Sequence, residues 1–414
     1  MITAPAPVAA LVLLAGSLAA QPVPADNTAP PEPGSELRAW LVTMSPGDKV
    51  WERFGHNAIR ILDTSTGQDI SYNWGIFDFD EPGFIARFLK GEMMYYMSPF
   101  WTQPMLEAYA AEGREVVLQE LNLTPAERTA LRDFVSWNAL PENKFYRYDY
   151  FRDNCSTRVR DVLDRVLRGA LRRRYEFDVT ETSWRFHIRR LTRMDPLLYT
   201  GMDVLLGTPG DRHVSVWEEM FLPMTLRDAV RETTLQDENG TRPLVLEETV
   251  AAPSARPPDA AAPPRWLAWY LLLGLALGGV LAWSGKRGAA GARWAKRTFG
   301  ALAAAWSLLA GFVGTLLVLV LFTDHQFMFW NENLFLLTPL SLALVVMAPL
   351  AARRPSRAAE WVALAVLAIA LVGLAAKVLP MTTQDNTIFL ALVVPVHVGL
   401  WWGARALGRS APPA

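Results

Sequence analysis

The polar and apolar positions divide the chain into two parts of different character. From residue 36 to residue 250 short apolar stretches alternate with polar ones, whereas long apolar runs follow one another after residue 265. Five of these runs approach the ~20 residues that a membrane-spanning helix needs. They cover residues 266–283, 299–322, 334–351, 360–379 and 387–403. We therefore expect a globular domain over residues 36–250 and a membrane domain of five transmembrane helices over residues 266–407.

The connections between the apolar runs predict how the membrane helices are oriented. The first connection carries five Lys or Arg residues and the third carries three, whereas the second, TDHQFMFWNEN, and the fourth, PMTTQDN, carry none. Basic connections stay on the cytoplasmic side of a membrane. The globular domain and the two polar connections are therefore expected on the periplasmic side of a bacterial inner membrane.

The N-terminal segment predicts export of the globular domain to the same side. Residues 1–20, MITAPAPVAALVLLAGSLAA, form a short apolar run that ends in small residues, which is typical of a secretory signal peptide. The positive residues that usually precede such a run are missing, so an uncleaved anchor or a misassigned start is an open alternative. Proline-rich stretches at 21–35 and 251–265 are expected to be extended linkers.

The globular part combines strand and helix patterns. Alternating apolar residues predict strands at 37–44, 56–62, 69–76 and 114–121, and helical periodicity predicts helices at 81–90, 124–139 and 154–168. The residues DTSTG are expected to join the second and third strands as a hairpin. An α+β domain followed by an all-α bundle is the fold that these patterns predict.

The composition narrows the class of ligand. The formal net charge is −1, but residues 147–193 hold 13 Arg and only 7 acidic residues, which predicts a basic surface suited to anionic lipid head groups. We expect lipids and a membrane as partners, and no nucleic acid. No closely spaced set of His, Cys, Asp and Glu indicates a metal site.

Cys155 is the only cysteine of the chain. A single thiol cannot form an internal disulfide, so it is either a buried small side chain or a free reactive group. Cys155 lies in the first turn of the predicted helix 154–168, on its apolar face, with Asp153 or Asn154 as the N-cap. Since the positive end of a helix dipole stabilises a thiolate, we expect the pKa of this thiol to be lowered.

A thiol nucleophile needs a partner that moves protons, and His56 is the candidate. It begins the strand 56–62, which a helix with Cys155 at its start could cross. If DTSTG closes a hairpin, Asn73 lies opposite Ala58 and diagonal to His56 on the same face, where it could orient the imidazole. A register shift of one residue would bring a neighbouring residue there instead, and a satisfied core histidine is the alternative for His56.

Several motifs together resemble one family. They are FGHNAIRI, SYNWG, LKGEMMYYM, LNLT, YDYFRDNCSTRVRD and the later LLGTPGDR and VWEEMFLP. This combination resembles the Lnb-type lipoprotein N-acyltransferases over nearly the whole chain, most strongly from residue 37 to residue 230. The order of His before Cys is also similar to the permuted papain-like arrangement of the lecithin-retinol acyltransferase group.

The resemblance implies a catalytic pair of His56 and Cys155 and a thiol-dependent acyltransferase. A fatty acyl chain would pass from a phospholipid to Cys155 as a thioester. It would then pass to the α-amine of the diacylglyceryl-cysteine of an apolipoprotein. No cofactor is required.

Further residues are candidates for substrate binding. Backbone N–H groups at the start of the helix, around Asn154, are natural oxyanion donors. Asp324, His325 and Asn331 of the polar connection could hold a lipid amine or head group, with capping and solvation as the alternative. Arg158, together with Arg160, Arg185 and Arg189, could hold phosphate, with ion pairing to acidic neighbours as the alternative.

Two other functions fit parts of the sequence. A membrane-tethered periplasmic amidase or peptidase acting on cell-wall peptide would use the same Cys155 and His56 pair. A non-catalytic membrane sensor or scaffold would use Cys155 only as part of its core.

Overall fold

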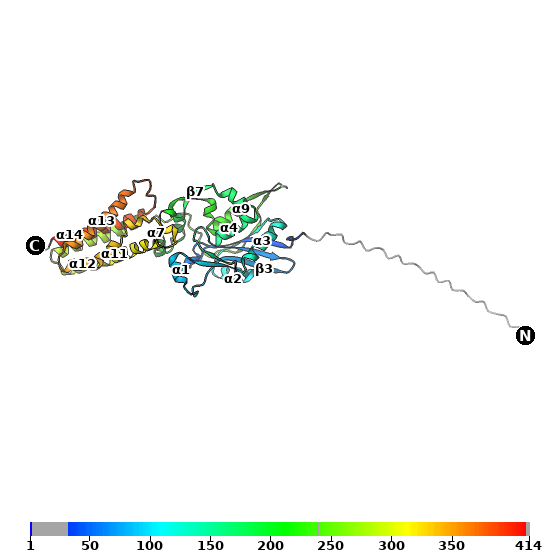
Figure 1. Ribbon diagram of the computed structural model, residues 1–414, viewed down its shortest axis with the longest axis horizontal. Helices are drawn as coiled ribbons and strands as arrows, with labels where there is room; N and C mark the ends of the chain where they lie inside the picture. Colours follow the sequence, from blue (N-terminus) through cyan, green and yellow to red (C-terminus); the bar gives the residue numbers. More distant parts are fainter. Residues whose placement is uncertain (2–31, 238–239, 411–414) are drawn as a thin grey trace.

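The chain forms two bodies that lie end to end (Figure 1). A computed structural model describes residues 1, 32–237 and 240–410. The predicted signal peptide at 1–20, apart from Met1, and most of the predicted linker at 21–35 lie outside the described residues. The first body is an α+β domain with an antiparallel sheet, and the second is a bundle with five candidate membrane helices. The predicted fold class is therefore confirmed.

One seven-stranded sheet organises the N-terminal domain, in the order β11-β5-β1-β2-β3-β4-β6. All neighbouring strands in it are antiparallel. The strands are β1 Leu37–Met44, β2 His56–Asp63, β3 Gln68–Ile76, β4 Met94–Trp101, β5 Val116–Leu121, β6 Phe145–Arg147 and β11 Val245–Ala252. The hairpin between β2 and β3 has the predicted register, because Ala58 lies directly opposite Asn73.

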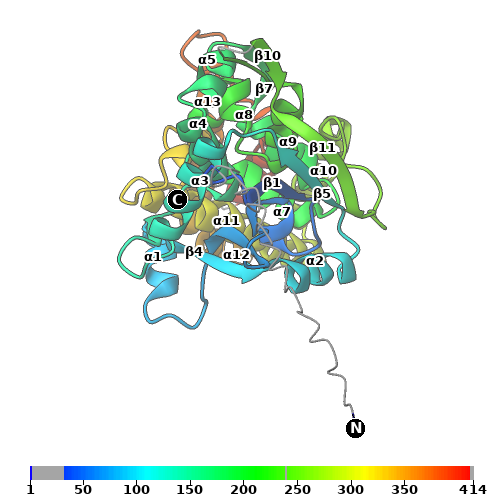
Figure 2. The ribbon, with the colours of Figure 1, turned by 90° about the vertical axis from the view of Figure 1, so that its right-hand side faces the viewer.

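Helices cover both faces of this sheet, since its strands are apolar on both sides. In β1, Leu41 belongs to one buried cluster, whereas Val42 and Met44 belong to another. Figure 2 shows α4 and α9 on one side of β1 and α2 on the other. The helices of this domain are α1 Phe84–Lys90, α2 Thr102–Ala111, α3 Pro125–Asn138, α4 Cys155–Val166, α5 Ala170–Tyr175, α6 Trp184–Leu191, α7 Pro196–Leu205, α8 Val216–Glu219 and α9 Pro223–Glu232.

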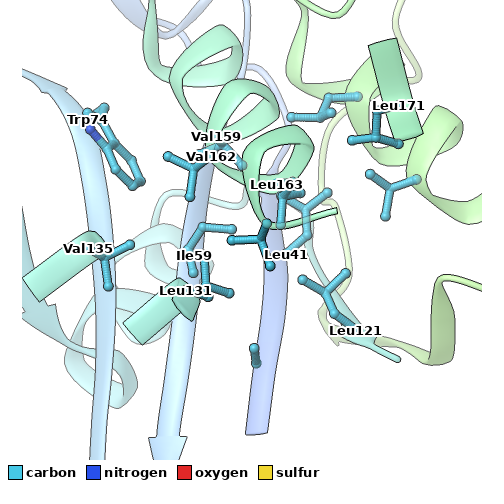
Figure 3. Packing of buried hydrophobic residues seen from close by; sticks show 14 of the residues in the cluster. Leu41, Ile59, Trp74, Leu121, Leu131, Val135, Val159, Val162, Leu163 and Leu171 are labelled. Carbon is cyan, nitrogen blue, oxygen red and sulfur yellow. The ribbon is translucent and has the colours of Figure 1, made fainter. Parts of the chain in front are cut away.

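Helix α4 lies across the middle of the sheet. Figure 3 shows Val159 and Leu163 on its underside, pointing toward Leu41 of β1 and Ile59 of β2. These side chains are fully buried, so the predicted apolar periodicity is what fixes the helix in place. Of the two predicted N-caps, Asp153 and Asn154, the structure has Asn154, whose side-chain oxygen accepts the backbone N–H groups of Ser156 and Thr157.

The membrane bundle contains the five predicted spans. Its helices are α10 Leu267–Ala289, α11 Arg293–Val320, α12 Leu342–Arg353, α13 Arg357–Ala376 and α14 Thr387–Arg409. The third span differs from the prediction of one helix at 334–351, because two short 3-10 turns, Glu332–Phe335 and Pro339–Ser341, precede α12. Pro339 has no N–H to continue a helix and starts a new turn. Gly311 and Gly314 of α11 leave room for this irregular segment to pack closely.

Both polar connections of the bundle face the N-terminal domain. The backbone N–H of Asp324 donates to the carbonyl of Lys90 in α1, and the side chain of Gln384 donates to the carbonyl of Leu206. The two basic connections therefore lie at the opposite end of the bundle, as does the C-terminus in Figure 1. This arrangement agrees with the predicted orientation, in which the N-terminal domain and the two loops without Lys or Arg share one side.

A cluster of ion pairs lies where the N-terminal domain meets the bundle, and one pair of this cluster crosses between them. Arg185 is 1% exposed and its guanidinium lies 2.7 Å from both Asp203 and Asp211. Arg189 pairs with Asp203 and with Asp385 of the last polar connection. Both guanidinium groups, of Arg185 and Arg189, are thus paired with carboxylates. Ion pairing therefore explains these two arginines, and phosphate binding is not needed to explain them.

Candidate active site

Cys155 begins α4 at the end of the sheet where β2 starts and β3 ends. Its side chain is partly buried and lies beside Gly75 at the end of β3, where an added Cβ would be 3.4 Å from the Cys155 Cβ. Gly75 has a φ of +89°, a conformation that residues with a side chain rarely adopt. The bare backbone at Gly75 therefore leaves the space in which the thiol sits.

The predicted thiolate is wrong for the resting site. Burial raises the pKa of the Cys155 thiol from 9.0 to about 11. The backbone N–H groups of Asn57, Ser156 and Cys155 and the charge of Arg114 lower this pKa, but they do not offset the burial. The helix N-terminus lowers the thiol pKa, as predicted. The surrounding protein has the larger, opposite effect, because it excludes the water that would solvate a thiolate. The Cys155 thiol is therefore neutral at physiological pH.

His56 is held in one orientation by Asn73. The His56 Nε2 lies 3.1 Å from Asn73 Oδ1, and because a carbonyl oxygen only accepts, the Nε2 must carry the hydrogen. Nδ1 is then the unprotonated nitrogen, able to act as a base. Burial lowers the pKa of His56 to about 4, and the nearby charge of Arg114 adds to this, so the imidazole is neutral at physiological pH.

Two contacts tie the cysteine helix to the histidine strand. The hydroxyl of Ser156, next to Cys155, lies 2.8 Å from Oδ1 of Asn57, next to His56. The backbone N–H of Asn57 also acts on the sulfur, where it lowers the thiol pKa. The structure thus brings the predicted nucleophile and base to one place, and both line the same cavity.

This cavity has a volume of about 890 Å³ and lies between the N-terminal domain and the bundle. One wall is aromatic, with Trp51, Phe77, Phe79, Phe84, Phe88 and Tyr95. Another wall is the connection after α11, from Asp324 to Met328. An elongated apolar group can therefore reach the thiol from the side of the membrane domain.

The predicted oxyanion donors are only partly free. Asn154 Oδ1 accepts the N–H groups of Ser156 and Thr157, both at 2.9 Å, and the Asn154 amide donates to two backbone carbonyls. Asn154 lines the cavity, but its own side chain is fully engaged in capping. The N–H of Cys155 is the donor of this turn that the cap does not occupy.

Arg158 does not lie among the residues that line the main cavity. Its guanidinium pairs with Asp153 and stacks 4.1 Å from the centre of the Tyr146 ring. Ion pairing with an acidic neighbour, the alternative for Arg158, is therefore what the structure shows. The arginine has a structural contact in place of the expected contact with phosphate.

The three candidates of the polar connection separate into two groups. Asp324 and His325 line the cavity; Asp324 pairs with Arg147, and His325 Nε2 donates to the carbonyl of Phe88 at 2.9 Å. Asn331 is buried away from the cavity lining and donates to backbone carbonyls at the end of α7. The expectation that Asn331 binds lipid is thus replaced by a role in docking.

Sequence reasoning missed two residues beside His56. The Tyr109 ring stacks on the imidazole with centroids 6.2 Å apart, and the guanidinium of Arg114 lies 4.6 Å from the Tyr109 ring. Arg114 lies two residues before β5, which pairs with β1. The predicted strand at 114–121 indicated where Arg114 lies, but nothing in the sequence predicts that Tyr109 stacks on His56.

Within the described residues, no three His, Cys, Asp or Glu side chains gather to hold a metal ion.

The neutral thiol predicts how Cys155 reacts with an alkylating agent. With a pKa of about 11, the thiolate is a small fraction at neutral pH, and alkylation by iodoacetamide should speed up roughly tenfold per pH unit from pH 7 to pH 9. Intact mass measures the rate cleanly, because the chain has one cysteine. A rate that is already constant between pH 6 and pH 8 would instead reveal a preformed thiolate.

The fold and the site define a membrane protein with a periplasmic α+β domain and a cysteine and histidine in a cavity next to its membrane helices. The family model described as the Lnb N-terminal periplasmic domain matches residues 33–191, and the one described as the Lnb transmembrane domain matches residues 263–404. The chain belongs to the Lnb family. No curated protein and no solved structure matches it.

Proposed function

We propose that this protein is a thiol-dependent lipoprotein N-acyltransferase of the bacterial inner membrane. It would move a fatty acyl chain from a phospholipid to the α-amine of a diacylglyceryl apolipoprotein. The observation that carries the proposal is the cavity, which combines a thiol and a neutral imidazole with an aromatic wall and an outward loop of the membrane domain.

In the first half-reaction, the neutral His56 takes the proton of Cys155 as the sulfur attacks an ester carbonyl of the phospholipid. The carbon–sulfur bond forms, and the N–H of Cys155 would stabilise the oxyanion. The carbon–oxygen bond of the ester then breaks, and His56 returns the proton to the departing lysophospholipid. An acyl thioester on Cys155 and a neutral imidazole remain.

In the second half-reaction, the free amine of the lipoprotein attacks the thioester carbonyl. His56 accepts a proton from the amine, the carbon–sulfur bond breaks, and the proton passes to the sulfur. The products are an amide and the original thiol, so the cycle closes without an external reactant.

The surroundings of the cavity support lipid substrates. The connection after α11 binds to α1 through Asp324 and His325, so α1 lies at the outward end of a membrane helix. Ile85 and Leu89 of α1 are 62% and 64% exposed, an apolar surface that suits contact with a bilayer. A peptidase that cleaves cell-wall peptide would not need an apolar surface beside the entrance to its cavity.

Purified protein, a phospholipid with labelled acyl chains and a diacylglyceryl lipopeptide test this function. We expect the lipopeptide to gain one labelled acyl chain, and a lipopeptide with a blocked α-amine to gain none, because the amine is the acceptor. Mass spectrometry of the lipopeptide measures both. Cleavage of cell-wall peptide without acyl transfer would favour the amidase instead.

A further inference from the structure

Arg114 is a buried cation in the cavity wall with an unused donor. It is 3% exposed and lines the cavity, and its Nη2 has no hydrogen-bond partner among the described residues. Its Nε donates to the carbonyl of Ser45 at 2.7 Å, which fixes the direction of the guanidinium. A buried guanidinium N–H without an acceptor is costly, and an anionic ligand would supply the missing partner.

Arg114 lies at the same end of the sheet as His56. Val116 of β5 pairs with Met44 of β1, and Met44 pairs with His56. Since adjacent strands lie ~4.8 Å apart, two steps across the sheet correspond to about 10 Å between the backbones. The ring of Tyr109 contacts both residues, because it stacks on the His56 imidazole and lies 4.6 Å from the Arg114 guanidinium.

Two carboxylates near Arg114 already have another partner. Lys49 Nζ lies 2.8 Å from Glu52 Oε1 and 3.2 Å from Glu112 Oε1. The remaining oxygen of Glu112 is 3.6 Å from Arg114 Nη1, beyond a good hydrogen bond. The Arg114 Nη2 thus stays available for a ligand that enters the cavity.

We propose that Arg114 binds the phosphate of the glycerophospholipid donor and so selects a phosphate-bearing ester over a neutral one. The inference rests on the proposed function. Only the glycerol backbone separates the phosphate from the ester carbonyls of such a lipid. A phosphate on Arg114 would therefore leave an ester carbonyl within the same cavity, which His56 and Cys155 also line. Arginine suits this task because its planar fork matches phosphate oxygens.

Binding of lipids that cannot be cleaved tests this site directly. A short-chain diether phospholipid and the matching diether glycerol are titrated into the full-length protein in a neutral detergent, with calorimetry as the readout. We expect the phospholipid to bind at least about tenfold more tightly than the neutral lipid. Arg114→Gln should weaken phospholipid binding about ten- to hundredfold and leave binding of the neutral lipid unchanged.

Arg38→Gln is the matched control, because Arg38 also pairs with a glutamate and stacks on an aromatic ring but lies on the exposed surface. It should bind both lipids like the wild type. Arg114→Lys keeps the charge and loses the planar fork, so its affinity for the phospholipid should fall between wild type and Arg114→Gln. It also replaces Arg114→Gln as the test if that variant does not fold. Inorganic phosphate that binds as tightly as the phospholipid would overturn the lipid assignment.

Acylation separates this inference from the proposed function. If the diether phospholipid binds as expected but ester phospholipids never acylate Cys155, the transfer reaction fails and the phosphate site stands. If Cys155 is acylated, and Arg114→Gln slows the reaction equally with phospholipid and with diacylglycerol or slows neither, the phosphate site is overturned and the transfer stands.

Discussion

Replacing Cys155 with alanine is expected to abolish acyl transfer to a diacylglyceryl lipopeptide. The loss should be at least about a thousandfold, because no covalent intermediate can form and the chain has no second thiol to replace it. Cys155→Ser should be nearly as inactive, since a hydroxyl with a much higher pKa replaces a thiol that is already difficult to ionise. The rate of lipopeptide acylation, followed by mass spectrometry, checks both variants.

Folding of these variants can be separated from catalysis. Cys155 is only partly buried, so removing its sulfur should change the thermal unfolding temperature little. A folded Cys155→Ala variant that still transfers acyl chains, or that still supports the cellular role of the protein, would favour the non-catalytic scaffold.

The second large effect is expected at His56. His56→Gln should slow acylation of Cys155 by about a hundred- to ten-thousandfold, because the thiol then has no base to accept its proton. His213→Gln is the matched control, since His213 is exposed and does not line the cavity. It should retain the wild-type rate. Equal rates for both variants would remove His56 from the mechanism.

Asn73 should act through the imidazole that it orients. Asn73→Ala keeps the base but frees the His56 ring to rotate and to change tautomer, so its rate should fall between wild type and His56→Gln. A double variant, His56→Gln with Asn73→Ala, should be no slower than His56→Gln alone, because the two residues act as one unit.

Much of this site could be predicted because it depends on local patterns. The hairpin length fixed the register of β2 against β3, and that register alone placed Asn73 beside His56. The apolar face of α4 determined which side of the helix meets the sheet, and therefore where Cys155 lies. These features follow from the spacing of apolar residues along the chain and from the length of the turn, and both can be read from a single sequence.

The protonation state of Cys155 could not be predicted in this way. The dipole of α4 is a local property, but the burial that outweighs it comes partly from segments distant in the chain, such as β3 at Gly75. The same applies to Asn331, whose partners lie at the end of α7, far away in the chain, whereas Arg158 pairs with Asp153, an acidic neighbour only five residues away. Residue type and position suggested ligand binding at both, and only the folded contacts show that each side chain is already engaged.

The irregular third span has a similar cause. The run at 334–351 is apolar enough to be a helix, but Asn331 and Asn333 hydrogen-bond to backbone carbonyls at the end of α7 and hold the segment in short turns. Backbone that departs from a helix in a membrane protein is tolerated where other protein segments cover it. The docking of the two domains therefore overrides the local preference for a helix.

The intact mass of the full chain, measured after mixing with phospholipid and without any acceptor, tests the central claim most directly. We expect a gain of one fatty acyl group that hydroxylamine removes and that Cys155→Ala does not acquire. No gain in mass with the acceptor withheld, or a gain that the alanine variant shares, would contradict it.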